Sequence, residues 1–113
     1  MLKLKTNIGA DPVTVLIKDA VSEFYRAVDK HPLWPDVLTT IPQEEVEIAL
    51  GWCRNQNDKA SEHCSAYTIY SEEWFEFLEA AVIKRDRAAA RHELTQCMAM
   101  LLRIGAHLDD YLP

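Results

Sequence analysis

Few residues in this sequence interrupt regular backbone structure, since glycine occurs three times and proline five times among 113 residues. An average protein carries roughly 12% of the two together, well above the share found in this chain. The shortage argues against collagen-like chains, long linkers and turn-rich all-β folds. A helical protein is the expected class, and the length suits one domain with a small core.

Basic residues are also scarce, because 12 Lys and Arg stand against 18 Asp and Glu, a formal net charge of −6 at pH 7. Nucleic acids and anionic lipids are bound non-specifically by clustered Lys and Arg, which release phosphate counterions. The acidic balance therefore predicts no nucleic-acid partner and no membrane partner. Small anions remain open as ligands if a metal ion carries them.

Long apolar runs are missing as well. Residues 1–8 lack the apolar segment of a signal peptide, and the longest uncharged stretches elsewhere have about nine residues, half of a membrane span. Cys53, Cys64 and Cys97 are odd in number and form no CxxC pair, which favours free thiols over disulfides or a zinc site. We therefore expect a cytoplasmic protein.

Apolar spacing and capping residues predict two helices in the first half of the chain. Asp11 followed by Pro12 is typical of a helix start, and the amphipathic pattern behind them ends before the prolines at 32 and 35. A second helix is expected to begin at the capping-box pattern Thr40-Ile-Pro-Gln43 and to end at the polar stretch 55–58. Its predicted buried residues are Val46, Ala49, Leu50 and Cys53.

Two further helices are predicted over residues 62–85 and 87–109, with Asp86 as the N-cap of the last one and Gly105 as a place where it frays or ends. So short a turn between them implies an antiparallel pair. The predicted fold is therefore all-α, an antiparallel bundle of about four helices in one domain spanning residues 1–113. Residues 1–10 fit either a flexible arm or a short strand.

Glutamates interrupt the apolar faces of the last two helices. At 100° per residue, Glu73 falls among apolar residues of the third helix and Glu76 borders them. Glu93 lies within the apolar stripe of the fourth helix, and Gln96 flanks that stripe. In contrast, Glu72 and Glu79 lie on the polar side, where glutamate is simply a good helix former.

An ionised carboxylate in a helix–helix seam costs several kcal/mol unless it is paired or bound to a cation. Two outcomes follow for Glu73 and Glu93. Either they pair with arginines near the turn, or they bind a metal ion through an all-oxygen site suited to Mg²⁺ or Mn²⁺. The available arginines are Arg85, Arg87, Arg91 and Arg103.

The segments Glu73-Trp-Phe-Glu76 and Glu93-Leu-Thr-Gln96 resemble the ExxE and ExxD motifs of MazG-like all-α nucleoside triphosphate pyrophosphohydrolases. The resemblance extends over residues 21–104 and includes the loop around residues 31–36 and the run from Glu93 to Arg103, as in small phage and bacterial members. Residues 42–66 form an insertion relative to the simplest members. The family's metal-binding carboxylates match Glu73, Glu76 and Glu93.

This resemblance implies a hydrolase that cleaves a nucleoside triphosphate to monophosphate and pyrophosphate with Mg²⁺, or with Mn²⁺ in its place. Gln96 stands where the family has Asp, and it offers a metal ion an oxygen without a charge. A nucleotide-binding variant with weakened activity is therefore also implied. Lys84, Arg85 and Arg91, near the helix turn, are the candidate cations for the substrate phosphates.

Two other classes of function stay open. A non-catalytic helical interaction or regulatory protein would account for Gln96 directly. The stretch from Arg85 to His92 also has the loose arginine and histidine arrangement of HEPN-like ribonucleases, although the acidic charge suits RNA poorly. Ferritin-like iron sites need paired ExxH motifs, which this sequence lacks.

Aromatic residues suggest assembly into a homo-oligomer, a dimer or larger. Trp74, Phe75 and Leu78 widen the apolar arc of the third helix beyond what one neighbouring helix covers, which is typical of a subunit interface. Trp34, in the proline-containing loop, is a candidate for stacking on a base.

Overall fold

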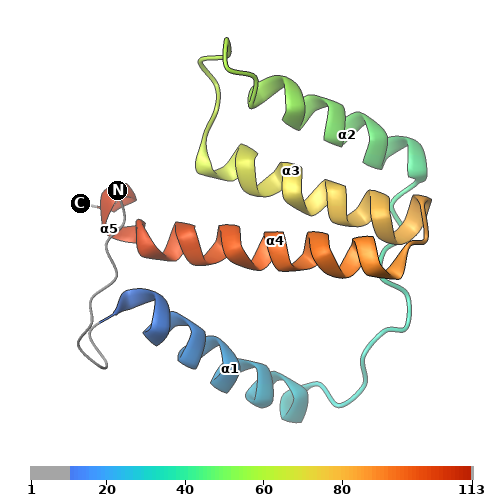
Figure 1. Cartoon of the computed structure of the whole chain (residues 1–113). Coiled ribbons are helices and arrows are strands. Elements are labelled where there is room, and N and C mark those ends of the chain that lie inside the picture. The colour runs from blue at the N-terminus through green and yellow to red at the C-terminus, as the bar shows by residue number, and fades with distance from the viewer. Residues whose placement is uncertain (1–10, 113) are drawn as a thin grey trace. The chain divides into compact units, whose positions relative to one another are not determined.

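The computed structural model describes residues 11–112, which form helices joined by loops, with no strand among them (Figure 1). This result confirms the all-α prediction. Residues 1–10, for which an arm or a strand was predicted, lie outside the described residues. The helices are α1 (Pro12–Lys30), α2 (Gln43–Gln56), α3 (Ala66–Leu78), the π-helical turn η1 (Glu79–Ile83), α4 (Arg87–Ala106) and α5 (Leu108–Tyr111).

The chain divides into two compact units. The first comprises Met1–Thr39 and Leu102–Pro113, and the second comprises Thr40–Leu101. The first unit therefore contains α1, the last turn of α4 and α5, whereas the second contains α2, α3, η1 and most of α4. No helix among the described residues is long and apolar enough to cross a membrane.

In the first unit, α1 begins and ends where the sequence predicts. The Asp11 carboxylate accepts hydrogen bonds from the Val13 N–H at 2.9 Å and from the Thr14 hydroxyl at 2.8 Å. The side chain of Leu16 lies so close to Gly105 that a Cβ at that position would collide with it. Gly105 thus permits close packing of α1 against the last turn of α4, and α4 continues through Gly105 to residue 106 before α5 begins.

The start of α2 differs from the prediction. Pro42, not Thr40, occupies the N-cap position, and no side chain caps the helix. The reason is steric, because a proline disfavours helical backbone in the residue before it, so the helix begins after Pro42. Val46, Leu50 and Cys53 are buried as predicted, while Ala49 is only partly buried.

The helix α3 begins four residues later than predicted because Ser65 and Thr68 form a capping box. The Ser65 hydroxyl accepts a hydrogen bond from the Thr68 N–H at 3.1 Å, and the Thr68 hydroxyl accepts one from the Ser65 N–H at 2.8 Å. These two bonds satisfy backbone donors that lie before the first helical hydrogen bond. They define the start of α3.

The turn between η1 and α4 is short, as predicted. Arg85 has φ of 52°, in the left-handed region, and the following Asp86 N–H donates to the Ala80 carbonyl at 3.0 Å. Asp86 then caps α4 by accepting a hydrogen bond from the Ala89 N–H at 3.0 Å. The turn reverses the chain, so that α3 and α4 run antiparallel (Figure 1).

The core of the second unit joins three helices. Val46 of α2, Phe77 and Leu78 of α3 and Cys97 of α4 form one buried cluster, against which Trp74 and Phe75 pack. In Figure 1, α3 lies between α2 and α4. The apolar arc of α3 thus packs in part against two helices of the same unit, with Leu78 buried and Trp74 and Phe75 partly buried, and oligomerisation stays a prediction.

Candidate metal site

Three glutamates from α3 and α4 converge in the second unit. Glu73, Glu76 and Glu93 each offer a carboxylate oxygen, and these oxygens all lie within 4.8 Å of one another. We call these three residues the acidic triad. All three side chains are partly buried, and their residue types and spacing allow the triad to hold a metal ion.

The local structure explains the convergence. Glu73 and Glu76 are three positions apart on α3, so they occupy neighbouring positions on one helical face. The turn at Arg85 and Asp86 brings α4 back alongside α3, which places Glu93 opposite that face. The phases of the two helices, which the sequence predicts correctly, thus bring the carboxylates together.

Burial and mutual repulsion make it unfavourable for all three carboxylates of the acidic triad to be ionised at once. Partial burial, together with the negative charges of Glu73, Glu93 and Glu72 in that order, raises the pKa of Glu76 to about 7. Burial and the charge of Glu93 also raise the pKa of Glu73, while His92 opposes the shift. Carboxylates this close resist simultaneous ionisation, and a divalent cation between them removes the repulsion.

Cations of the protein do little to relieve this repulsion. Within residues 11–112, no Lys or Arg forms an ion pair with Glu73 or Glu93. The expected alternative, pairing with one of the arginines at 85, 87, 91 or 103, is therefore not what the structure shows. Glu76 has one such partner, Arg54 of α2, whose Nη2 lies 3.6 Å from Oε1.

Gln96 follows Glu93 by one turn of α4 and is partly buried. Its side-chain nitrogen lies 3.4 Å from Nε2 of His92, which is four residues earlier on the same helix. The Gln96 amide thus contacts a side chain of its own helix. Its role as a fourth metal ligand stays a prediction.

The sequence missed two residues beside the triad. Glu72, assigned to the polar side of α3, accepts a hydrogen bond from Asn57 Nδ2 at 3.0 Å, and its charge contributes to the raised pKa of Glu76. The four-residue spacing of Glu72 and Glu76 was the available signal. Arg54 had no such signal, because the docking of α2 on α3 is a tertiary contact.

The cysteines are free thiols in the described chain, as predicted. Burial, together with the nearby charges of Glu73 and Glu93, raises the pKa of Cys97 to about 11. Burial and the charge of Glu72 likewise raise the pKa of Cys53. Both thiols therefore stay protonated at neutral pH, which makes them poor nucleophiles and poor metal ligands.

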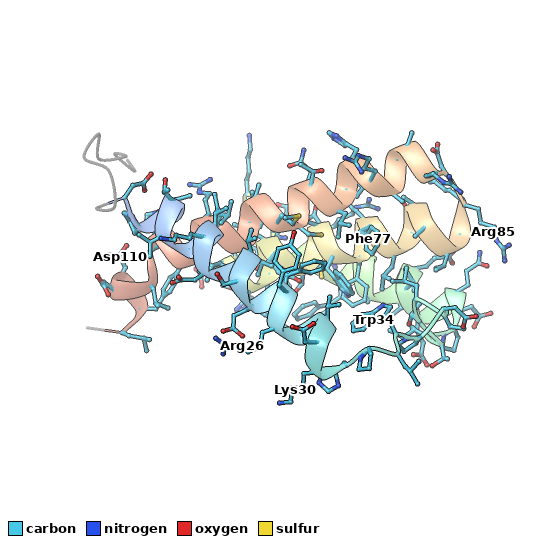
Figure 2. All side chains as sticks on the ribbon, turned by 90° about the horizontal axis from the view of Figure 1, so that it is seen from below. Arg26, Lys30, Trp34, Phe77, Arg85 and Asp110 are labelled. Atoms are coloured by element: carbon cyan, nitrogen blue, oxygen red, sulfur yellow. The ribbon has the colours of Figure 1, made fainter. Side chains whose placement is uncertain are left out.

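The three candidate phosphate-binding cations take no part in the ion pair of the acidic triad. Lys84 Nζ is 3.4 Å from Oε1 of Glu79, and Arg85 extends away from the helices at the turn (Figure 2). Arg91 is exposed on the second turn of α4. None of the three forms an ion pair with Glu73, Glu76 or Glu93, so their role as phosphate ligands stays a prediction.

His92, the histidine of the HEPN-like alternative, lies near acidic groups. It is exposed, and its charge lowers the pKa of Glu73. A phosphodiester brought to this histidine would meet the carboxylate of Glu73, which repels it in the absence of a cation. The surroundings of His92 thus favour a metal site over metal-free RNA cleavage.

Comparisons with protein-family models, with curated proteins and with solved structures found no match for this chain. The resemblance to MazG-like enzymes stays a prediction from the sequence.

Proposed function

We propose that the acidic triad binds one divalent cation, Mg²⁺ or Mn²⁺. The observation that carries this proposal is the approach of three partly buried carboxylates to within 4.8 Å, two of them without an ion-pair partner among the described residues. Hard divalent cations prefer oxygen ligands, and carboxylates are their usual protein ligands. The lower charge of a site with Gln96 in place of Asp suits one ion better than two.

The reaction that we propose is hydrolysis of a nucleoside triphosphate to a monophosphate and pyrophosphate, as in the MazG-like enzymes that the two motifs resemble. Glu73, Glu76 and Glu93 are the proposed catalytic and metal-binding residues, with Gln96 as an additional oxygen ligand. A cation held there would neutralise phosphate charge and lower the pKa of an attacking water. The carboxylates themselves orient the ligand through that cation.

A second candidate function is a non-catalytic protein that binds a metal ion or a nucleotide, or that acts only through helical interactions. The observation in its favour is Gln96, whose amide contacts His92 and adds no charge to the triad. Such a protein would release no pyrophosphate even where it binds a nucleotide. A HEPN-like ribonuclease is a minor alternative, because the carboxylate of Glu73 near His92 would repel a phosphodiester in the absence of a cation.

The test is a screen of nucleoside triphosphates with Mg²⁺ or Mn²⁺ in which pyrophosphate and orthophosphate are measured separately. We expect pyrophosphate release that the Glu73→Gln variant loses and that a Glu79→Gln control retains, because Glu79 lies in the adjoining η1, outside the triad. Release of orthophosphate alone would indicate another reaction. Nucleotide binding without any release would favour the non-catalytic alternative.

We also propose that the chain forms a homo-oligomer in the cytoplasm, where free cysteines persist in the reduced state. The surface that supports assembly is on α2. Ile48 and Trp52 are 71% and 51% exposed and lie on the face of α2 opposite its buried residues. The pair forms an apolar ridge that a second copy of the chain can cover across a twofold axis.

A further inference from the structure

Arg54 is the cation that α2 contributes to the acidic triad. Its Nη2 atom lies 3.6 Å from Oε1 of Glu76, and this is the only ion pair of the triad within the described residues. The side chain of Arg54 is 54% exposed, whereas that of Glu76 is 24% exposed. The guanidinium thus lies at the open edge of a partly buried anionic site.

The contact is loose enough to be exchanged. Charge-assisted hydrogen bonds between guanidinium and carboxylate measure about 2.7–2.9 Å, and 3.6 Å is well beyond that range. An arginine has five N–H donors in a planar fork, and a single long contact leaves most of them for other acceptors. Exposed pairs of this kind also contribute little to stability.

A divalent ion at the triad would change the balance around Arg54. A bound cation would neutralise the negative charge of Glu76 and repel the guanidinium of Arg54. The guanidinium would then need another anion as its partner. A phosphate group bound to the same ion brings negative oxygens to this position, and the guanidinium fork matches two phosphate oxygens at once. We propose that Arg54 binds the phosphate oxygens of a ligand held at the acidic triad, an inference that rests on the proposed metal site.

The other candidate cations lack this placement. Lys84 forms a similar exposed pair, but with Glu79, which is outside the triad. Its side chain is 63% exposed and that of Glu79 is 24% exposed, so the Lys84–Glu79 pair closely matches the Arg54–Glu76 pair in geometry and burial. Because Lys84 is itself a candidate phosphate ligand, the control for the loss of one exposed, paired cation is Arg26 of α1, which lies 2.9 Å from a glutamate of the same helix.

The experiment compares the parent with Arg54→Gln, Arg54→Lys and the control Arg26→Gln by calorimetric titration, first with Mn²⁺ alone and then with inorganic pyrophosphate in saturating Mn²⁺. In Arg54→Gln we expect Mn²⁺ to bind severalfold more tightly, because a competing cation is gone. We expect pyrophosphate to bind about tenfold more weakly, because a charge-assisted phosphate contact is lost. Arg54→Lys should fall between the parent and Arg54→Gln, and Arg26→Gln should match the parent.

The outcomes separate this inference from the metal site itself. If the parent binds no Mn²⁺, the metal site and the role of Arg54 both fail. If the parent binds Mn²⁺ but not pyrophosphate, or if Arg54→Gln binds pyrophosphate as tightly as Arg26→Gln does, the metal site stands and Arg54 is not a phosphate ligand. Opposite changes in the two affinities would not arise from loss of folding, which thermal melting of each variant measures independently.

Discussion

Asn57 holds Glu72 through a hydrogen bond of 3.0 Å between Nδ2 and Oε1, and thereby ties the end of α2 to the acidic face of α3. The same amide nitrogen donates to the Thr68 carbonyl at 2.9 Å, and the amide oxygen accepts from the Thr68 hydroxyl at 2.8 Å. Thr68 is 4% exposed, so its hydroxyl is shielded from water and forms its hydrogen bond with Asn57 instead. One side chain thus connects the loop, the helix start and the acidic surface.

Replacing Asn57 by Asp should lower the free energy of unfolding by about 2 kcal/mol at neutral pH. The change removes the donor of two hydrogen bonds and adds a charge beside Glu72. An Asn55→Asp variant is the matched control, because Asn55 is exposed at the end of the same helix. Urea unfolding of both variants checks the prediction, and equal losses would mean that added charge alone destabilises the protein.

The pH dependence of stability should reveal the raised pKa of Glu76, about 7 in the folded protein against 4.5 ordinarily. The folded state then holds the proton more tightly, so the contribution of Glu76 to stability is fully present below about pH 4.5 and is lost as pH rises to about 7. Glu76→Gln removes this dependence. In chelator, the variant should exceed the parent in stability by about 2 kcal/mol at pH 8 and by little at pH 4.5.

Unfolding in urea at the two pH values measures this difference. The prediction would be wrong if the advantage of Glu76→Gln over the parent were the same at pH 8 and at pH 4.5. A variant less stable than the parent at pH 8 would show that the contact with Arg54 outweighs repulsion within the triad.

Mn²⁺ should raise the melting temperature of the parent and not that of Glu73→Gln. A cation that binds only the folded state stabilises it according to its concentration and affinity, by about 2.7 kcal/mol at 100 times the Kd. Glu79→Gln should keep the response, because Glu79 pairs with Lys84 and not with the triad. Calorimetric melting with chelator and with Mn²⁺ tests this, and an equal Mn²⁺ response in all three proteins would place the ion elsewhere.

Gln96→Asp should tighten Mg²⁺ or Mn²⁺ binding and raise pyrophosphohydrolase activity. Gln and Asp both present an oxygen, but only Asp adds a negative charge beside the ion. Without metal the added charge repels the triad, so the variant should be the less stable protein in chelator and gain more from metal than the parent does. Equal gains in melting temperature would show that residue 96 does not contact the ion.

Trp52→Glu should reduce the mass of the protein in solution to that of a monomer. Trp52 and Ile48 form the exposed ridge of α2, and a charge at the centre of an apolar interface is costly to bury. Trp34→Glu is the control, because Trp34 is 85% exposed in a loop of the other unit. Light scattering at micromolar concentration measures the mass of the parent and of both variants. A parent that is already monomeric would contradict the proposed homo-oligomer.

Helix positions could be predicted where a local interaction decides them. Asp11 with Pro12 and the cap at Asp86 act on backbone groups within three residues, and both helices begin there. The start of α2 was mispredicted although the signal was local, since Pro42 excludes the helix that a cap at Thr40 needs. The start of α3 was mispredicted because Thr68 acts as both donor and acceptor in the box with Ser65.

Of the candidate site, the sequence alone determined the phases that direct Glu73, Glu76 and Glu93 to one seam, because helical periodicity and a short turn suffice to place them. Only the tertiary structure decided what surrounds the seam. Docking of α2 on α3 builds the shared core and brings Arg54 to Glu76 and Asn57 to Glu72. Such contacts join residues distant in the chain, and they depend on packing against a shared core, which leaves no periodic trace in the sequence.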